Sequence, residues 1–491
     1  MKGTGNAIFD VAVIGGGAVG CAVLRELSRY DLDLLLLEKE ADLAEGVTKA
    51  NSGVLHAGFN VPAGSLKART NVAGLRKIYG LAEELGVPHK KTGKLVVALT
   101  DEERPRLEAL KADGDRSGAP GLEIVGQDRI REIEPLARGR WALFSPHSGI
   151  ISPYEFTIAL AESAWLNGAR VLLEAPVLSV SAEGGHIRLE TPKGAFSARR
   201  VVNAAGLFSD EIARLAGIED YRVFPYRGEY LISDKDCGLR LRLRLPVYPV
   251  PPQDDPGLGI HITPTMEGNI LLGPSAEAIE DKRDVASSRR VMDQLKAEAA
   301  RLMPELAGVS FIHSYAGVRP KLVDPSGREK FADFVVEESA VRPGWINIAG
   351  IESPGLTAAP AIADMVVEMI GAGLDMRPMP GFKTGPPREA RFAALSDEDR
   401  AGRVARDPDW GEMVCRCEHV TRAEVAAALH NPFGARTMDA VKRRTRCGMG
   451  RCQGGFCTPR IVEIMQSEGS PLEGITKKGG GSRLFFGRLK D

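Results

Sequence analysis

The chain has 491 residues, 43% hydrophobic and 26% charged, with a net charge of −1 and only seven cysteines. This balance excludes a global field that attracts nucleic acid or anionic membrane, and the few cysteines exclude a disulfide-stapled scaffold. No apolar run reaches the roughly 18 residues that a membrane span needs. The start, MKGTGNAIFDVAVIGGG, has no cleavable signal pattern. We therefore expect a cytoplasmic protein that is at most peripherally associated with a membrane.

The first strong motif is DVAVIGGGAVGCAVLRELSRYDLDLLLLEKE, near the N-terminus. Its apolar runs and helical periodicity predict a strand, a helix and a second strand, over residues 10–14, 18–29 and 34–37. A G-x-G-x-x-G spacing separates the first strand from the helix, and it consists of Gly15, Gly17 and Gly20. In this fingerprint the first glycine makes a tight turn, the second lets a pyrophosphate approach, and the third lets helix and strand pack closely.

Four further residues complete the predicted dinucleotide site. Ala18 and Val19 stand at the helix N-terminus, whose free N–H groups and partial positive charge suit phosphates. Glu38, followed by Lys39, ends the second strand and can accept a hydrogen bond from a ribose hydroxyl. The motif does not distinguish FAD from NAD. No second fingerprint occurs in the sequence, so we expect one dinucleotide.

The middle of the chain predicts mixed structure rich in antiparallel β-strands. We expect a strand over 93–99, a β-hairpin that turns near residues 267–268, and helices over 101–113, 155–167 and 288–303. Late in the chain, GWINIAGIESPGLTAAPAIADMVVEMIGAG predicts another strand, glycine turn and helix. Because β-structure is inserted between halves of a dinucleotide domain, two interleaved domains are expected.

Six segments give the chain its resemblance to the FAD-dependent oxidoreductases of the D-amino-acid-oxidase superfamily. They are VAVIGGGAVGCAV, TKANSGVLHAGFNVPAGSLKA, VVNAAGLFSDEIA, FPYRGEY, SYAGVRPKL and INIAGIESPGLTAAPAIA. The second is most similar to the L-2-hydroxyglutarate oxidases and to glycerol-3-phosphate dehydrogenase-like members. The resemblance implies an α/β fold (α+β overall), in which a Rossmann-like FAD domain is interleaved with an antiparallel-β substrate domain.

The resemblance also implies further FAD contacts. They comprise the flavin-side loop Thr48, Asn51, Ser52 and Gly53, the adenine-side Val177, the cleft residues Ala205 and Gly206, and the ring contacts Gly350, Ser353, Gly355 and Leu356.

Oxidation of an alcohol by a flavin needs a base for the hydroxyl proton. His56 is the first candidate, because it follows the flavin-side loop and histidine titrates near neutral pH; a purely hydrogen-bonding role is the alternative. His261 and His313 are weaker candidates, for which a structural role is favoured.

Arg319 matches the arginine of the superfamily's G-x-R-P segment, which holds a substrate carboxylate. Its guanidinium suits a carboxylate or a phosphate equally. Arg227 and Lys67 could add charge, or could instead form ion pairs.

Five cysteines gather near the C-terminus, in CRC (Cys415 and Cys417) and in CGMGRCQGGFC (Cys447, Cys452 and Cys457). Metal and iron–sulfur sites usually take four, and the spacing alone leaves two possible second pairs. A [2Fe–2S] cluster is favoured over zinc, because two cysteines separated by one residue are unusual in a zinc knuckle. An electron relay also suits a flavin domain.

This segment is similar to the bacterioferritin-associated-ferredoxin-like [2Fe–2S] domain, as found at the end of anaerobic glycerol-3-phosphate dehydrogenase subunits. That resemblance implies Cys415, Cys417, Cys452 and Cys457 as ligands, and it leaves Cys447 as a neighbour. We also predict a helix capped by Thr421 with Glu424, a second helix that carries a basic run over 442–446, and a last helix that opens at residues 458–459.

These observations predict the following domains. The FAD-binding domain spans 7–90, 146–218 and 335–376; the substrate domain spans 91–145 and 219–334; then come a linker over 377–411, the small helical [2Fe–2S] domain over 412–468, and a flexible tail over 469–491.

The function we predict is an FAD-dependent dehydrogenase for a small anionic hydroxy compound, first sn-glycerol 3-phosphate and second an L-2-hydroxy acid such as 2-hydroxyglutarate. An amine or amino acid is a third option. Electrons would pass through the cluster to an acceptor protein or companion flavoprotein subunit, in a possible homo- or hetero-oligomer. Two other hypotheses remain open: an electron-transfer subunit that docks through the basic run 442–446, and an oxidase with structural zinc.

Overall fold

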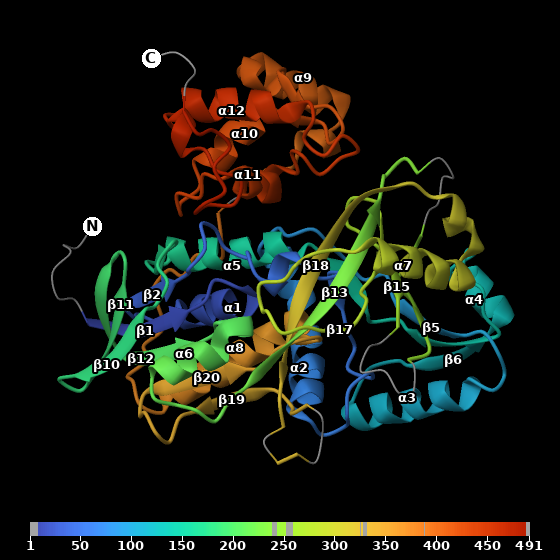
Figure 1. The fold of residues 1–491 in the computed structure, drawn as a ribbon, viewed down its shortest axis with the longest axis horizontal. Helices are drawn as coiled ribbons and strands as arrows, with labels where there is room; N and C mark the ends of the chain where they lie inside the picture. The colour runs from blue at the N-terminus through green and yellow to red at the C-terminus, as the bar shows by residue number, and fades with distance from the viewer. Residues whose placement is uncertain are drawn as a thin grey trace.

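The computed structural model describes residues 8–237, 243–251, 259–324, 326–327, 331–386 and 388–487 (Figure 1). Two large sheets make up the body of the molecule, and a small helical module, coloured orange to red, stands above α5. None of the helices within these ranges is long and apolar enough to cross a membrane.

Within the described residues the first sheet has eight strands, which three separate parts of the chain supply. Its centre is parallel: β1 pairs with β2 and β12, and β12 pairs with β20. The strands are β1 (Ile8–Ile14), β2 (Leu34–Leu37), β9 (Arg170–Leu172), β10 (Ser179–Glu183), β11 (His186–Thr191), β12 (Gly194–Asn203), β19 (Val335–Glu338) and β20 (Trp345–Ala349).

Both faces of this sheet are covered, which explains why its central strands are apolar throughout. Val11 and Leu36 pack on one side with helices, and Ala12 and Leu35 pack on the other side with the helix α6 (Ser209–Leu215). The helices on the first side are α1 (Ala18–Leu27), α2 (Leu66–Glu84), α5 (Pro153–Leu166) and α8 (Gly355–Gly371).

The second sheet is mostly antiparallel and has nine strands in the part of the chain that is described. Its longest pair is β13 with β18, in register from Val223 opposite Leu322 to Ile232 opposite His313. The strands are β5 (Lys94–Ala98), β6 (Glu123–Gly126), β7 (Trp141–Ser145), β13 (Val223–Ser233), β14 (Val247–Pro249), β15 (His261–Pro264), β16 (Ile270–Gly273), β17 (Glu277–Ala278) and β18 (Phe311–Leu322).

Three helices accompany this sheet, and a small sheet joins the two large ones. The helices are α3 (Arg104–Ser117), α4 (Gln127–Ile133) and α7 (Arg289–Leu302), and the small sheet is made of β3 (Val54–Leu55), β4 (His89–Lys90) and β8 (Gly149–Ile151). The elements predicted from periodicity are confirmed, including the hairpin between β15 and β16. The largest boundary shift is at α3, which ends at Ser117 rather than at residue 113.

The C-terminal module has a short hairpin of β21 (Met413–Cys415) and β22 (Val420–Thr421), followed by three helices. The helices are α10 (Arg422–Leu429), α11 (Met438–Thr445) and α12 (Cys457–Ser467). The predicted capping box is confirmed: Thr421 accepts from the Glu424 backbone, and the Glu424 side chain accepts from the Thr421 backbone.

Two segments carry structure where the sequence suggested little. Within the expected linker, α9 (Asp397–Arg406) begins after Ser396, whose side chain caps it. The expected flexible tail is wrong for residues 469–487: Ile475 is fully buried in the module core, and the Met438 N–H donates to the Thr476 carbonyl. The apolar residues of this segment are scattered among glycines and lysines without helical or strand periodicity, which gave too weak a signal for the prediction.

Buried ion pairs join the module to the first sheet. Asp42, which has no exposed surface, accepts hydrogen bonds from Arg443 at 2.9 Å and from Arg444 at 2.6 Å. Arg443 also pairs with Glu45. Burial opposes the charge on Asp42, but the two guanidiniums hold its pKa below the usual value. The basic run 442–446 therefore forms ion pairs inside the molecule. It is not the free docking face that the hypothesis of an electron-transfer subunit required.

Replacing Asp42 by Asn should lower the free energy of unfolding by about 3 kcal/mol, because two buried guanidiniums lose their carboxylate. Glu40→Gln is the matched control: Glu40 pairs with Lys39 at the surface, where an ion pair contributes at most about 1 kcal/mol. Urea unfolding followed by tryptophan fluorescence measures both. Equal losses would mean that the buried pairs stabilise no more than a surface pair.

Candidate functional site: a cavity shared by two cofactor sites

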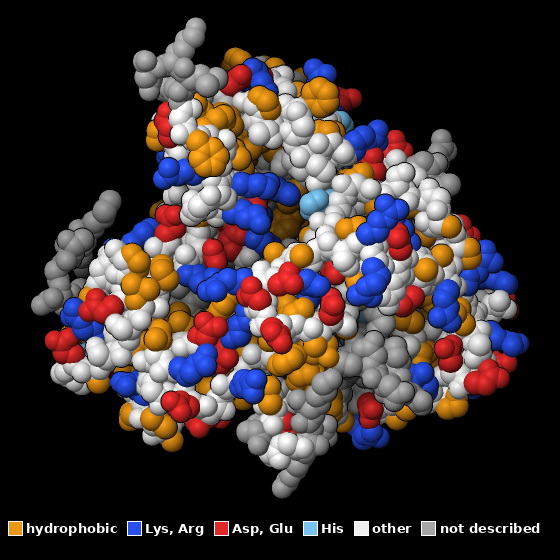
Figure 2. Space-filling view, in the orientation of Figure 1, with side chains coloured by type: hydrophobic (Ala, Val, Ile, Leu, Met, Phe, Trp, Pro, Cys, Tyr) orange, Lys and Arg blue, Asp and Glu red, His pale blue; other side chains and the backbone are white. Residues whose placement is uncertain are grey.

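A cavity of about 1140 Å³ lies where the two sheets and the module meet. Its walls come from the glycine loop after β1, from β13 and β18, and from the module. Figure 2 shows Lys and Arg side chains gathered around the hollow between the module and the body. A cavity of this size is large enough for a dinucleotide together with a small substrate.

The glycine loop has the shape that a pyrophosphate requires. Gly15 has a φ of +111°, and a Cβ there would lie 2.5 Å from the Ala204 carbonyl oxygen. A Cβ on Gly20 would lie 2.0 Å from the Gly15 carbonyl oxygen, so helix and strand can pack this closely only without a side chain. Gly17 precedes α1 and provides no side-chain cap, which leaves the helix N-terminus facing the cavity.

The end of β2 lies beside this loop. The Glu38 carboxylate accepts from the Gly16 N–H at 2.6 Å and from the Glu40 N–H at 2.8 Å. Burial is the largest influence on Glu38 and raises its pKa. Glu38 and Lys39 both line the cavity, where a ribose would lie next to the helix N-terminus.

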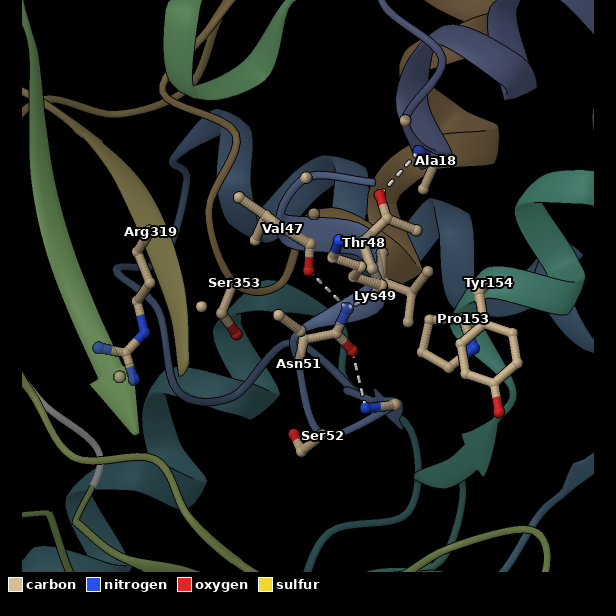
Figure 3. A pocket seen from close by; sticks show the side chains of 18 of the residues that line it. Ala18, Val47, Thr48, Lys49, Asn51, Ser52, Pro153, Tyr154, Arg319 and Ser353 are labelled. Atoms are coloured by element: carbon tan, nitrogen blue, oxygen red, sulfur yellow. Dashed lines mark hydrogen bonds between the residues drawn. The ribbon is translucent and has the colours of Figure 1, made fainter. Parts of the chain in front are cut away.

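A tight loop forms the next part of the wall (Figure 3). The Asn51 side chain donates to the carbonyls of Val47 and Thr48, and it accepts from the Gly53 N–H at 2.8 Å. The Thr48 hydroxyl accepts from the Ala18 N–H at 3.1 Å, which ties the loop to α1. Ser52 also lines the cavity.

Most of the other predicted cofactor residues line the same cavity. These are Val19, Ala205, Gly206, Ser353, Gly355 and Leu356. Val177 and Gly350 do not line it: Val177 is buried in a core cluster, and Gly350, with a φ of +70°, packs against Leu322. Their contacts with a cofactor stay a prediction.

Arg319 projects into the cavity from β18 (Figure 3). Its Nη2 donates to the Ser275 carbonyl at 3.2 Å, and within the described ranges no carboxylate forms an ion pair with it. Arg227 differs: it pairs with Asp284 at 2.5 Å and with Glu277 at 2.6 Å, and it does not line the cavity. Its predicted role toward a substrate anion therefore has no support, because two carboxylates already satisfy its charge.

Lys67 lies on the cavity wall in a three-membered ion network. Glu352 accepts from Lys67 at 2.8 Å and from Lys321 at 3.1 Å. Burial opposes the charge on Glu352, but the two ammonium groups lower its pKa. One carboxylate with two ammonium groups leaves this wall with a net positive charge.

His56 is held at its backbone from two sides. The Thr357 hydroxyl accepts from its N–H at 3.0 Å, and the Asn71 amide donates to its carbonyl at 2.8 Å. Its ring lines the cavity, and Nδ1 lies 3.4 Å from Nζ of Lys94. Burial, then the charge of Lys94, keeps the pKa of His56 well below its usual value, so the imidazole is neutral.

The other two histidines have different settings. His261 stacks on Tyr248 with ring centroids 3.4 Å apart and is almost fully buried, whereas His313 is exposed at the cavity mouth. Sequence reasoning missed Lys94 and Tyr248. The available signal was a lysine inside the apolar strand GKLVVAL, where a charged residue is exceptional.

The five module cysteines divide into a buried group of three and a more exposed pair. Cys415 interacts through its thiol with Cys447 and Cys457, and all three are buried. The sulfur atoms of Cys417 and Cys452 lie 3.8 Å apart. Among the described residues, no group of three His, Cys, Asp or Glu side chains is placed so that it could hold a single metal ion. A two-iron cluster, however, takes four thiolates spread over two metals, and five thiols are within this small module.

Backbone N–H groups point at these sulfur atoms, as an iron–sulfur site requires. Cys452 accepts from the backbones of Phe456, Gly454 and Gly455, which lower its pKa. Cys415 interacts with the thiols of Cys447 and Cys457, which lower its pKa most, and it also accepts from backbone N–H groups. A Cβ on Gly450 would lie 2.3 Å from the Cys417 Cβ, so this loop can fold over the cysteines only with glycine.

The same loop reaches the large cavity. Met449 and Gln453, on either side of Cys452, line it together with Arg446. Arg446 is buried and pairs with Glu418 at 2.8 Å and with Glu267 of the body at 3.2 Å. The cysteine loop is therefore fixed against the wall of the cavity that holds the dinucleotide fingerprint.

Comparison with protein families agrees with this layout. The FAD dependent oxidoreductase family matches residues 10–369. The chain belongs to that family. The BFD-like [2Fe-2S] binding domain matches residues 413–467, so this oxidoreductase uses FAD and carries a [2Fe–2S] domain, not a zinc module. The predicted family, fold and cofactors are confirmed.

Three known proteins illustrate the similarity. A glycerol 3-phosphate dehydrogenase of Caloramator mitchellensis is 38% identical, over 98% of this chain and 99% of its own. The mitochondrial L-2-hydroxyglutarate dehydrogenase of Homo sapiens is 32% identical, over 75% of this chain and 90% of its own. The FAD-bound, dithionite-reduced L-alpha-glycerophosphate oxidase of Mycoplasma pneumoniae superposes with a TM-score of 0.71 and 27% identity, covering 78% of this chain and 100% of that one.

The ligand assignment can be tested by exchanging single cysteines for serine. If Cys457 is a ligand and Cys447 a neighbour, Cys457→Ser should lose the cluster's visible spectrum and most of its iron, and Cys447→Ser should keep both. The two thiols are similarly buried and both interact with Cys415, so each variant controls for the packing effect of the other. Loss of iron only in Cys447→Ser would reverse the assignment.

Proposed function

We propose that this oxidoreductase dehydrogenates sn-glycerol 3-phosphate and passes the electrons through its [2Fe–2S] domain to an acceptor protein. The observation that carries the proposal is the similarity to a glycerol 3-phosphate dehydrogenase over 98% of the chain, a span that includes the cysteine module. The unpaired guanidinium of Arg319 in the cavity is consistent with an anionic substrate.

The cavity offers positive charge where a phosphate would bind. The planar fork of Arg319 can donate two parallel hydrogen bonds to phosphate oxygens. Lys67 and Lys321 share the single carboxylate of Glu352, so the surplus positive charge lies on the same wall. A phosphate ester gains more from this surplus than a neutral alcohol does, because buried charges are weakly screened.

His56 is suited to accept the hydroxyl proton. Its imidazole is neutral, and its backbone is fixed by Thr357 and Asn71, so the ring has little freedom to leave the cavity wall. Bound FAD supplies the hydride acceptor, and the cluster supplies a one-electron carrier. The residues of the chain therefore have to bind the anion, orient the hydroxyl and remove its proton.

The shared cavity wall supports electron transfer from the flavin side to the module. Met449 and Gln453 bring the cysteine loop to the same space as the fingerprint glycines. We infer an acceptor protein or a companion flavoprotein subunit beyond the module. We place the system in the cytoplasm, which suits a chain whose seven cysteines form no disulfide in the structure.

A second candidate substrate is an L-2-hydroxy acid. Several relatives are L-2-hydroxyglutarate dehydrogenases, with 32% to 34% identity, and the fork of Arg319 would hold a carboxylate equally well. Their matches cover only 72% to 75% of this chain, which is why we rank this substrate second.

Anaerobic addition of sn-glycerol 3-phosphate should reduce the bound FAD and so bleach its absorbance at about 450 nm. The absorbance bands of the cluster should then decrease, because the cluster receives electrons from the flavin. L-2-hydroxyglutarate is the parallel sample, and glycerol is the control without an anionic group. Bleaching by L-2-hydroxyglutarate alone would make the second candidate the substrate. No bleaching by either compound, in a preparation that dithionite reduces, would overturn both proposals.

Arg319→Met should weaken substrate binding by about 10²-fold or more, because the substrate anion would lose its cationic partner in the cavity. The dissociation constant can be measured from how the single-turnover rate of flavin reduction saturates with substrate concentration. Arg290→Met is the matched control: its side chain is 74% exposed and pairs only at long range with Glu277. Unchanged affinity in Arg319→Met would remove this arginine from the substrate site.

A further inference from the structure

Lys94 is a fully buried lysine beside the cavity, and its surroundings are unusual for this residue. Its side chain has no exposed surface, and Nζ lies 4.3 Å from the ring centroid of Phe59 and 4.5 Å from that of Tyr248. Across the described part of the chain, no carboxylate forms an ion pair with it. Lysine is almost never fully buried without such a partner.

The polar contact of Lys94 is with the ring of His56, at 3.4 Å between Nζ and Nδ1. Two proton arrangements are chemically distinct. An ammonium on Lys94 would donate to Nδ1, and the neutral imidazole would then carry its proton on Nε2 and could not accept another there. A neutral amine would instead accept from the Nδ1 proton, which leaves a lone pair on Nε2.

The surroundings of Lys94 favour the second arrangement. The groups that face its amine are the rings of Phe59 and Tyr248 and the imidazole of His56, and His261 stacks on Tyr248. None of these is a carboxylate that would stabilise an ammonium. Burial lowers the pKa of Lys94 to about 7, so the neutral amine is well populated at neutral pH. Burial raises the pKa of Tyr248, so its phenol stays neutral.

We propose that Lys94 is a positioning residue and proton acceptor for His56: as a neutral amine it fixes the imidazole tautomer that has a free Nε2, and it receives the Nδ1 proton when Nε2 is protonated. The proposal rests on the proposed dehydrogenase function. Bound FAD would supply the acceptor for the hydride that leaves the hydroxyl-bearing carbon with its electron pair. The hydroxyl proton goes to Nε2 of His56, and the Nδ1 proton goes to Nζ of Lys94. One proton thus leaves the substrate and one arrives at Lys94, which must release it before the next turnover.

This pair differs from the usual support of a catalytic histidine, in which a carboxylate accepts the second ring proton. A carboxylate would add a negative charge close to the substrate anion. A neutral amine fixes the same tautomer without that repulsion, and when protonated it adds positive charge near the anion that Arg319 holds.

The first test reads the tautomer directly in the wild-type protein loaded with FAD and its cluster. ¹⁵N-histidine NMR at pH 8 should show His56 with its proton on Nδ1, and His56→Gln assigns the signal. A proton on Nε2, with an unprotonated Nδ1, would overturn the proposal. Because no substrate is present, this result is independent of whether glycerol 3-phosphate is oxidised.

The second test is the rate of flavin reduction in a single turnover, measured between pH 5.5 and 9. In the wild type the rate should rise with pH through about 7, because Lys94 must lose its proton to act as an acceptor. Lys94→Met should slow reduction by about 10²-fold or more and abolish this rise, with little change in substrate affinity. Lys91→Met is the matched control, since Lys91 is an exposed lysine three residues away, and it should keep the wild-type rate and profile.

Lys94→Arg separates proton acceptance from charge, because a guanidinium stays protonated throughout this pH range. Restoration of the rate by arginine, or an unchanged pH profile in Lys94→Met, would overturn the proposal. If neither variant folds, the wild-type tautomer decides the question.

Discussion

The burial of Asp42 between Arg443 and Arg444 is the contact on which the two-cofactor layout depends. Asp42 follows the strand whose end carries Glu38, and the two arginines belong to the helix that leads into the cysteine loop. Buried charges of this kind are stable only while each has its partner, because an unpaired charge in the interior strongly lowers the free energy of unfolding. The module is therefore held in one position, and Met449 remains on the cavity wall.

The electrostatics of the cavity follow a simple division. Arginines that serve the architecture, such as Arg227 and Arg446, are each matched by carboxylates. Among the residues that the structure describes, Arg319 has no carboxylate partner, and Lys94 faces aromatic rings and an imidazole. Basic side chains without a carboxylate partner are the exception around this cavity, so Arg319 and Lys94 mark where the protein can act on the charge and the protons of a ligand.

The sequence predicted those parts of the fold and site that depend on local pattern. The fingerprint glycines, the central strands and the Thr421–Glu424 capping box follow from short-range sterics and hydrogen bonding, and all are present. What it could not predict arises from long-range pairing. Nothing local to Arg227 indicates that Asp284, 57 residues away, neutralises it, and nothing local to Lys94 indicates that His56 lies beside it.

The position of Lys477 and Lys478 bears on how the cavity is put together from the chain. Lys477 and Lys478 line the same cavity as the fingerprint glycines near the start of the chain. The backbone around them is fixed to α11 through the Met438 and Asp439 N–H groups. The two sides of one cavity therefore come from parts of the chain that are far apart in sequence, and the later part is synthesised long after the fingerprint glycines. The cavity is complete only when the segment around Lys477 and Lys478 has packed against α11.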